Sequence, residues 1–378
     1  MSPRASKDPV EGEAGPSLSV RLRERIINAG PLTFREWMDA ALYDGREGYY
    51  LRSGAERWGR AGDYRTAPER STLFAATFAR HFTKLFEELD GPRVFHLLEA
   101  GGGAGRFAHG VLTTLRRDAP HVYEALRYVF DETSADSRRR AAALLKPFAE
   151  RIEFSRLSEL TGKLDHVVIF SNELLDAFPV HRVTVRDGRL LESYVGLDDD
   201  GGFVFIEAEP STPRLAEQFG RLGVTLEEGQ VAEVNLEAAG WIARAAGVVG
   251  RGFVITVDYG DEAAALYGAT HRNAGTLRAF RGHEFVEDVL SDPGRQDLTT
   301  TVNWTQVVNE GDAAGLKTRA LERLDAFLLR AGLVEQLELE SARVASEAEV
   351  AALRLDAREM ILPGGMASHF QVLMQQKV

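Results

Sequence analysis

The sequence contains no cysteine among its 378 residues. This absence excludes a disulfide framework, a thiolate zinc site and a cysteine nucleophile. The nine histidines show no H-E-x-x-H or comparable metal-ligand spacing, and lone histidines such as His81, His96 and His166 are more often core or surface residues than ligands. We therefore expect chemistry that uses neither a thiol nor a bound metal.

Long apolar runs are also missing. No stretch approaches the length of a membrane span, and residues 1–17 lack the apolar segment of a signal peptide. The same residues are rich in Pro, Gly, Ser and charge, so we expect a disordered tail there. By default, these absences predict a cytoplasmic protein without a membrane span.

Positive charge is scarce relative to negative charge. Lys and Arg number 45 against 57 Asp and Glu, which gives a formal net charge of −12. Because binding to a nucleic-acid backbone rests on clustered Lys and Arg, this balance argues against a nucleic-acid partner. It suits a basic partner instead.

Strand and helix patterns alternate between residues 94 and 172. This order is typical of a parallel sheet with helices on both faces, an α/β fold of the doubly wound type. The predicted strands cover 94–98, 128–131, 151–154 and 165–170, and the predicted helices cover 106–117 and 134–148. The residues just past the carboxyl ends of such strands line the ligand crevice.

The rest of the chain elaborates this unit. We predict an N-terminal helical cap over 18–90 and a main domain over 91–378, with insertions at 180–235 and 261–303. Turn signals predict antiparallel strands in the first insertion, whereas the second is polar and reads as irregular. A long irregular insertion is more often functional than accidental. The remaining predicted elements are helices at 71–89, 236–246 and 346–361, a partly helical segment at 304–331, and strands at 252–257, 333–339 and 369–374.

A glycine-rich turn follows the first strand of the alternating region. Glu99 is followed by glycines at every second position, Gly101, Gly103 and Gly105, before the helix that starts at Arg106. Glycines permit positive φ and close approach of a ligand, and the N–H groups of the helix start point into the same space. We expect the cofactor to bind there.

Two cofactors compete for this turn. Residues 103–108 satisfy the G-x-G-x-x-A dinucleotide fingerprint, but a pyrophosphate on the helix start would face the negative charge of Glu99. S-adenosylmethionine has no phosphate, and its ammonium can be held by a strand-end carboxylate directly or through water. The order E-x-G-x-G-x-G therefore favours the sulfonium cofactor, with a nicotinamide oxidoreductase as the remote alternative.

A second acid stands at the end of the next strand. Glu132 or Asp131 is placed to accept both ribose hydroxyls of a cofactor, although nicotinamide enzymes have an acid in nearly the same place. The alternative for Glu132 is a solvated charge at the strand end.

A third group follows the strand at 165–170. Glu173 and Asp176 stand at i and i+3, and they share a face if these residues are helical. Paired carboxylates match a guanidinium, so Glu173 is predicted to position one nitrogen and accept a proton late in the reaction, while Asp176 holds another. The alternative is that Asp176 caps the local turn and Glu173 contacts only solvent. Asn172 is predicted to bond the cofactor or the local backbone.

These residues together resemble the MidA-like family of S-adenosylmethionine-dependent methyltransferases, which includes the mitochondrial assembly-factor methyltransferase of respiratory complex I. The glycine turn is one of several matching segments in the same order. The others are 31–34, 47–50, 62–69, 132–134, 172–181, 258–260, 293–294 and 297–299.

The resemblance implies a class I methyltransferase fold, Rossmann-like, with a seven-stranded, mostly parallel sheet whose last strand is antiparallel. It implies methylation of an arginine side chain in a partner protein, such as a respiratory-complex-like subunit, with S-adenosyl-L-methionine as cofactor. By position, the cofactor contacts would be Glu99, Gly101, Gly103, Gly105, Glu132 and Asn172, and the catalytic residues Glu173 and Asp176. The loop 62–69 would fold over the cofactor, with Thr66 as a contact, or alternatively would form a packed cap without contact to the cofactor.

Some positions depart from the family pattern. Ala100 and Gly102 replace a larger apolar residue and proline, Leu175 replaces an aromatic residue, and Asn303 with Trp304 replaces an acid and phenylalanine. No cofactor carboxylate or turn glycine is lost, so the departures leave the substrate open. A small-molecule methyltransferase and a non-catalytic assembly factor remain alternatives. An apolar helix face near the N-terminus suits a homodimer and equally packing on the sheet.

Overall fold

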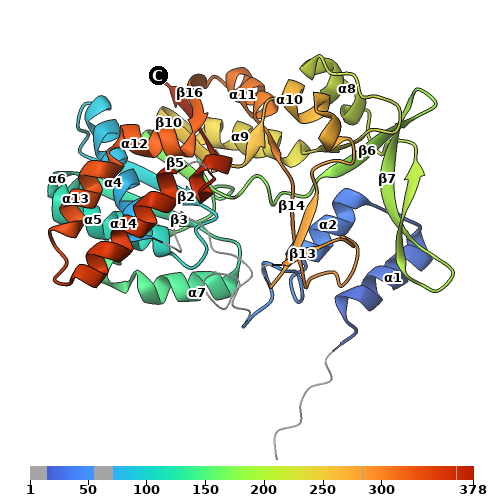
Figure 1. Ribbon diagram of the computed structural model, residues 1–378, viewed down its shortest axis with the longest axis horizontal. Coiled ribbons are helices and arrows are strands. Elements are labelled where there is room, and N and C mark those ends of the chain that lie inside the picture. The colour runs from blue at the N-terminus through green and yellow to red at the C-terminus, as the bar shows by residue number, and fades with distance from the viewer. Residues whose placement is uncertain (1–14, 55–70, 283, 363) are drawn as a thin grey trace, which may run out of the picture.

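A seven-stranded sheet forms the centre of the computed structural model, which describes residues 15–54, 71–282, 284–362 and 364–378 (Figure 1). The strand order is β16-β17-β10-β5-β2-β3-β4. Their bounds are β2 (Phe95–Ala100), β3 (Leu126–Asp131), β4 (Ile152–Phe154), β5 (Leu164–Asn172), β10 (Val249–Asp258), β16 (Lys317–Arg323) and β17 (Gln371–Lys377). The neighbours from β10 to β4 pair in parallel, whereas β17 is antiparallel to both β10 and β16. The expected sheet with an antiparallel last strand is confirmed.

Helices cover both faces of this sheet because its central strands are apolar on both sides. In β2, Phe95 and Leu97 face one hydrophobic cluster, and Leu98 and Ala100 face the other. The first face carries α4 (Thr72–Glu88), α5 (Arg106–Asp118), α6 (Pro120–Ala125), α7 (Ala135–Leu144), α12 (Leu324–Ala331), α13 (Leu333–Ser341) and α14 (Glu347–Ile361). The second carries α9 (Leu236–Val248) and α11 (Trp304–Ala313).

Aromatic packing holds α4 against the sheet. Ser71 caps the helix by accepting a hydrogen bond from the Leu73 N–H at 3.1 Å. Phe74, Phe78 and Phe82 follow at intervals of four residues, so they lie on one helix face. The Phe78 ring lies 4.9 Å from that of Phe170 on β5. The carboxyl end of β5, where the crevice begins, is thereby fixed from below.

A second, five-stranded sheet lies beside the first (Figure 1). It contains β1 (Leu32–Thr33), β6 (His181–Arg186), β7 (Arg189–Leu197), β8 (Phe203–Ala208) and β9 (Val231–Val234). The helices α1 (Leu18–Ala29) and α2 (Phe34–Tyr43) share one hydrophobic cluster with it, and α8 (Arg214–Leu222) and α10 (Ala263–Gly268) share another. The antiparallel strands expected after residue 180 are confirmed.

The segment 261–303 is more regular than its composition predicts. It contains α10 and a three-stranded sheet of β12 (Arg278–Arg281), β13 (Glu284–Val286) and β14 (Asp297–Thr299). A two-stranded pair joins β11 (Gly260–Asp261) to β15 (Val302–Asn303). Strands this short hold too few side chains to show a period, so the expectation of an irregular insertion is wrong.

Two elements of the C-terminal region differ from the prediction. Residues 333–339, predicted as a strand, belong to helix α13, and the edge strand β16 lies at 317–323 within the segment predicted as partly helical. The alternation of Leu and Glu at 337–339 resembles a strand, but Leu333 and Gln336 are the residues that α13 buries, at helical spacing. At the sheet edge β16 is partly exposed and lacks an apolar run, so its sequence does not show the pattern of a strand.

Other predictions stay open. α4 packs on the main sheet while α1 and α2 pack on the smaller one, and the division of the chain at residue 90 stays a prediction. Residues 1–14 of the predicted tail and the loop 62–69 with Thr66 lie outside the described residues. Leu22 and Ile26 of the N-terminal helix are buried within the chain itself, and a homodimer stays a prediction.

A search of the described residues finds no helix long and apolar enough to cross a membrane. Three short 3-10 helices, at Lys146–Phe148, Thr270–Arg272 and Met366–His369, complete the regular structure of the described ranges.

Candidate functional site

The glycine turn joins β2 to α5 at the carboxyl edge of the main sheet. Gly101, Gly103 and Gly105 have φ of +73°, +54° and +82°, a region that other L-residues rarely adopt. Gly102 is constrained differently, because a Cβ there would overlap the ring of Phe130. Gly105 begins α5 without a side-chain cap, so the first N–H groups of that helix are left for a ligand.

The two acids at the end of β3 have different partners. The Glu132 carboxylate accepts hydrogen bonds from the Gly103 N–H at 2.8 Å and the Ser134 N–H at 2.6 Å. Asp131 instead accepts from the Leu157 N–H at 2.9 Å and holds the loop after β4. Both line the cavity described below, but Glu132 is the acid that is fixed against the glycine turn.

Glu99 is buried at the end of β2, only 5% exposed. Its carboxylate accepts a hydrogen bond from the Tyr128 hydroxyl at 2.6 Å. Burial raises the pKa of Glu99 to about 8, and the charge of Glu132 adds to this, while the Tyr128 bond opposes it. A cation beside Glu99 would favour the ionised carboxylate.

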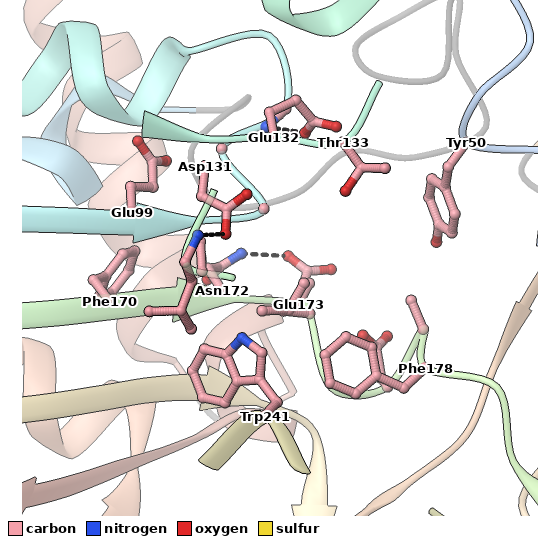
Figure 2. A pocket seen from close by; sticks show the side chains of 18 of the residues that line it. Tyr50, Glu99, Asp131, Glu132, Thr133, Phe170, Asn172, Glu173, Phe178 and Trp241 are labelled. Atoms are coloured by element: carbon pink, nitrogen blue, oxygen red, sulfur yellow. Dashed lines mark hydrogen bonds between the residues drawn. The ribbon is translucent and has the colours of Figure 1, made fainter. Parts of the chain in front are cut away.

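A cavity of about 350 Å³ joins these groups to the segment after β5. Its size suits a small organic ligand. Figure 2 shows Glu99 and Phe170 at one end of the cavity, with Tyr50 and Phe178 at the other. Its lining includes Tyr43, Tyr50, Glu99, Gly101, Gly103, Asp131, Glu132, Leu157, Asn172, Glu173, Asp176, Ala177, Phe178, Trp241, Tyr259, Asp297 and Thr299.

The segment after β5 forms a bend and a turn. The prediction that Glu173 and Asp176 share the face of a helix is therefore wrong. Glu173 has φ of +50°, and its N–H donates to the Val257 carbonyl at 2.9 Å. Both Glu173 and Asp176 nevertheless line the cavity. The bend therefore brings the two carboxylates together by a route that the residue spacing did not indicate.

Asp258, at the end of β10, anchors this bend. It is fully buried, and its carboxylate accepts hydrogen bonds from the backbone N–H groups of Leu175, Leu174 and Asp176 at 3.0, 3.3 and 3.4 Å. The same side chain accepts from the Tyr259 N–H at 2.9 Å. Sequence reasoning assigned Asp258 no role. Its signal was an acid directly after a buried strand.

The three acids form a cluster with little compensating charge. Burial, together with the charge of Asp176, raises the pKa of Glu173 to about 8. Burial raises the pKa of Asp176 to about 6, and it raises that of Asp258 well above its ordinary value. Within the described residues neither Glu173 nor Asp176 forms an ion pair.

Asn172 orients Glu173. Its side-chain amide donates to a Glu173 carboxylate oxygen at 3.0 Å (Figure 2), and the Tyr259 hydroxyl donates to the other oxygen at 3.5 Å. The Asn172 Oδ1 is buried and has no hydrogen-bond partner among the described residues. The role of Asn172 at the cofactor stays a prediction, and so do the assignments of the other site residues.

Sequence reasoning missed an aromatic wall of the cavity. The rings of Tyr43 and Tyr50 stack at 5.5 Å with 29° between their planes. The Tyr43 hydroxyl donates to the Ala177 carbonyl at 3.0 Å, and the Tyr50 hydroxyl donates to Asp297 at 2.6 Å. The two tyrosines are close in sequence, but their partners Ala177 and Asp297 lie 134 and 247 residues further along the chain, so spacing could not join them.

The glycine turn, the two strand-end carboxylates and the pair Glu173 and Asp176 all line one cavity. Residues 77–321 match a family model described as "Putative S-adenosyl-L-methionine-dependent methyltransferase". The chain belongs to this family. The expected resemblance to MidA-like methyltransferases is thereby confirmed, and S-adenosyl-L-methionine is the cofactor of this methyltransferase.

Named relatives agree with this assignment. The methyltransferase is 26% identical over 338 residues to "Protein arginine methyltransferase NDUFAF7 homolog, mitochondrial" of Drosophila melanogaster, covering 83% of this chain and 74% of that protein. It is 24% identical over 339 residues to "Protein arginine methyltransferase NDUFAF7, mitochondrial" of Homo sapiens, covering 82% and 73%.

A solved structure matches the whole fold. It is described as a "likely methyl transferase from Burkholderia thailandensis bound to S-adenosyl-homocysteine". The TM-score is 0.84 at 29% sequence identity, over 95% of this chain and 92% of that one. The class I methyltransferase fold is confirmed by this likeness and by the sheet order.

Proposed function

We propose that this methyltransferase transfers methyl groups to an arginine side chain of a partner protein. The observation that carries the proposal is the pair Glu173 and Asp176, two buried carboxylates that line the cofactor cavity and lack an ion-pair partner among the described residues. Buried carboxylates are costly without a cation. A guanidinium, which is planar and always charged, supplies that cation and matches two carboxylates.

The other end of the cavity fits the cofactor. We assign the cofactor ammonium to Glu99, whose buried carboxylate gains from a neighbouring cation, and the ribose hydroxyls to Glu132, which the Gly103 N–H holds in place. Gly101, Gly103 and Gly105 keep the backbone open to close approach. Asn172 lies between the two ends, with one buried oxygen left to accept a hydrogen bond.

The acid cluster then has a defined task in the transfer. When bound, the cofactor supplies a methyl group on a positively charged sulfur. Glu173 and Asp176 hold the guanidinium so that one nitrogen faces the cofactor end, which is a contribution of orientation. Glu173, with its raised pKa, accepts the proton that this nitrogen loses as it gains the methyl group. Asp258 holds the bend that carries both carboxylates, because its own carboxylate accepts hydrogen bonds from the backbone N–H groups of Leu175 and Asp176.

The names of the relatives support a protein acceptor, since both are protein arginine methyltransferases. The formal charge of −12 suits a basic partner. A respiratory-complex-like subunit as partner and a cytoplasmic location stay predictions.

The test is methyl transfer to proteins in a lysate from cells that lack the gene for this chain. The purified chain is added with S-adenosylmethionine carrying a labelled methyl group, and the methylated residues are mapped by mass spectrometry. We expect label on arginine in one or a few proteins. Label that reaches only small molecules, or no label at all in the presence of bound cofactor, would contradict the proposal and favour a small-molecule methyltransferase or an assembly factor respectively.

A further inference from the structure

Two matching segments of the sequence have no task in the cofactor end of the cavity. One ends in Tyr49 and Tyr50, after α2, and the other is β14, which begins at Asp297. The structure joins them, because the Tyr50 hydroxyl donates to the Asp297 carboxylate at 2.6 Å across 247 residues of chain. Asp297 is fully buried and Tyr50 is half-buried. The bond is therefore shielded from solvent.

The joined pair lies at the acceptor end of the cavity. Tyr50 and Asp297 both line it, as do Glu173 and Phe178. Figure 2 shows the Glu173 carboxylate directed away from Glu99, toward the space that Tyr50 and Phe178 border. Tyr50 and Glu173 therefore border the same space.

Several contacts fix the position of the Tyr50 ring. The Tyr43 ring stacks on it at 5.5 Å, and the Tyr49 ring meets it edge-on at 5.1 Å. The insertion that carries Asp297 is tied directly to the acid bend, because the Thr300 N–H donates to the Asp176 carbonyl at 3.0 Å. The aromatic wall and the carboxylates are therefore parts of one connected arrangement.

The chemistry of the two walls points to a planar cation. A guanidinium can bond carboxylates through its edge while its face rests on an aromatic ring, which an ammonium cannot do with both surfaces at once. A neutral side chain would leave the carboxylates uncompensated. This contact requires a fixed orientation of the Tyr50 ring. Asp297 accepts the hydrogen bond from the Tyr50 hydroxyl that fixes it.

We propose that Tyr50 and Asp297 form the specificity-determining wall of the acceptor site, with Tyr50 contacting the face of a guanidinium and Asp297 acting as a positioning residue for Tyr50. This inference rests on the proposed function and narrows it, since it assigns the choice of arginine over lysine to two residues outside the parallel sheet.

The test uses methylguanidine and methylammonium as probes of the full chain saturated with S-adenosyl-homocysteine. Affinities are measured by calorimetry for the wild type, Tyr50→Phe, Tyr50→Leu and Asp297→Asn. Tyr194→Phe is the matched control, because it removes a phenol hydrogen bond to the Glu209 carbonyl outside the cavity. Thermal midpoints and S-adenosyl-homocysteine affinity show whether each variant is folded.

We expect methylguanidine to bind the wild type at least about fivefold more tightly than methylammonium does. Asp297→Asn and Tyr50→Phe should weaken methylguanidine binding by about fivefold, because the first replaces the charged acceptor of the Tyr50 hydroxyl with a neutral amide and the second removes that hydrogen bond. Tyr50→Leu should weaken it by more than about tenfold, because the ring is lost as well. Tyr194→Phe should leave it unchanged. A higher methylguanidine affinity in Tyr50→Phe than in Tyr50→Leu identifies the aromatic ring itself as the contact.

Equal affinity for the two probes, or unchanged methylguanidine affinity in folded Tyr50→Phe and Tyr50→Leu, would overturn the inference. If Asp297→Asn does not fold, the two Tyr50 variants decide. The proposed function fails separately: lysate proteins then receive no methyl group on arginine, although the methylguanidine site and its dependence on Tyr50 persist. If arginine is methylated and the acceptor KM is the same in wild type and Tyr50→Leu, the function stands and the inference falls.

Discussion

The two ends of the cavity are built in different ways. The cofactor end comes from neighbouring stretches of chain, the glycine turn at 99–105 and the end of β3 at 131–132, and the Gly103 N–H to Glu132 bond joins them directly. The end that we propose for the acceptor contains Tyr50 from the N-terminal region, Glu173 from the bend after β5, and Asp297 from an insertion. A sheet edge built from neighbouring stretches of chain can hold a cofactor, whereas segments attached around the sheet can vary the substrate.

The largest expected effect is that of Glu173→Gln, which should lower methyl transfer without changing the binding of S-adenosyl-homocysteine. Glutamine keeps the shape and the contact with Asn172 but cannot accept the proton from the guanidinium, so we expect methyl transfer to fall by at least about 100-fold. S-adenosyl-homocysteine affinity, measured by calorimetry, should change little. Glu209→Gln, an exposed carboxylate paired with Arg189, is the matched control. Full transfer activity in Glu173→Gln would show that Glu173 is not the proton acceptor.

Glu99→Gln is expected to have a smaller effect, and to lower the affinity for S-adenosyl-homocysteine rather than the rate of methyl transfer. This change removes the carboxylate that we assign to the cofactor ammonium, so S-adenosyl-homocysteine affinity should fall by about tenfold or more. Transfer measured at saturating S-adenosylmethionine should recover most of the wild-type rate. A variant that binds S-adenosyl-homocysteine as tightly as the wild type would break the division between the two ends.

Glu99→Gln also has a predicted effect on stability against pH. The pKa of Glu99 rises from an ordinary 4.5 to about 8 in the fold, so the folded state binds this proton more tightly than the unfolded chain. The free energy of unfolding of the wild type should therefore fall as pH rises through this interval. Glutamine does not ionise, so the thermal midpoint of the variant relative to wild type should increase from pH about 5 to about 8.5. No such trend would mean that Glu99 stays ionised in the fold.

The smallest effect is expected where the N-terminal region meets the main sheet at its surface. Arg35 of α2 and Glu237 of α9 form an ion pair at 2.6 Å with 32% and 47% of their side chains exposed. Exposed pairs contribute little, so Glu237→Gln should change the free energy of unfolding in urea by less than about 0.5 kcal/mol. Transfer activity should not change. A larger loss would mean that this pair contributes more to stability than its exposure predicts.

The sequence predicts the glycine turn and the central strands well because the information for them is local. Glycines at alternate positions after Glu99 predict a turn with positive φ, and the structure has that turn. Consecutive apolar residues predict strands covered on both faces, and β2, β5 and β10 are such strands. Where a strand lies at the edge, as β16 does, the pattern fades and the prediction fails.

The acceptor end could be predicted only in part. Glu173 and Asp176 were identified by their place after a buried strand, although the helical spacing offered for their alignment is not the one the chain adopts. Asp258 was overlooked as their anchor, since its partners are backbone N–H groups that no residue type reveals. Tyr50 and Asp297 meet only because α2 and the three-stranded sheet pack together.

The sequence by itself determined the fold class, the cofactor and the glycine turn that we propose for it, because each depends on residues within a few positions of one another. Tertiary structure alone decided which side chains line the other end of the cavity. Contacts such as that between Tyr50 and Asp297 depend on how separate elements pack, and the burial that raises the pKa of Glu99 and Glu173 exists only once those elements have closed around them.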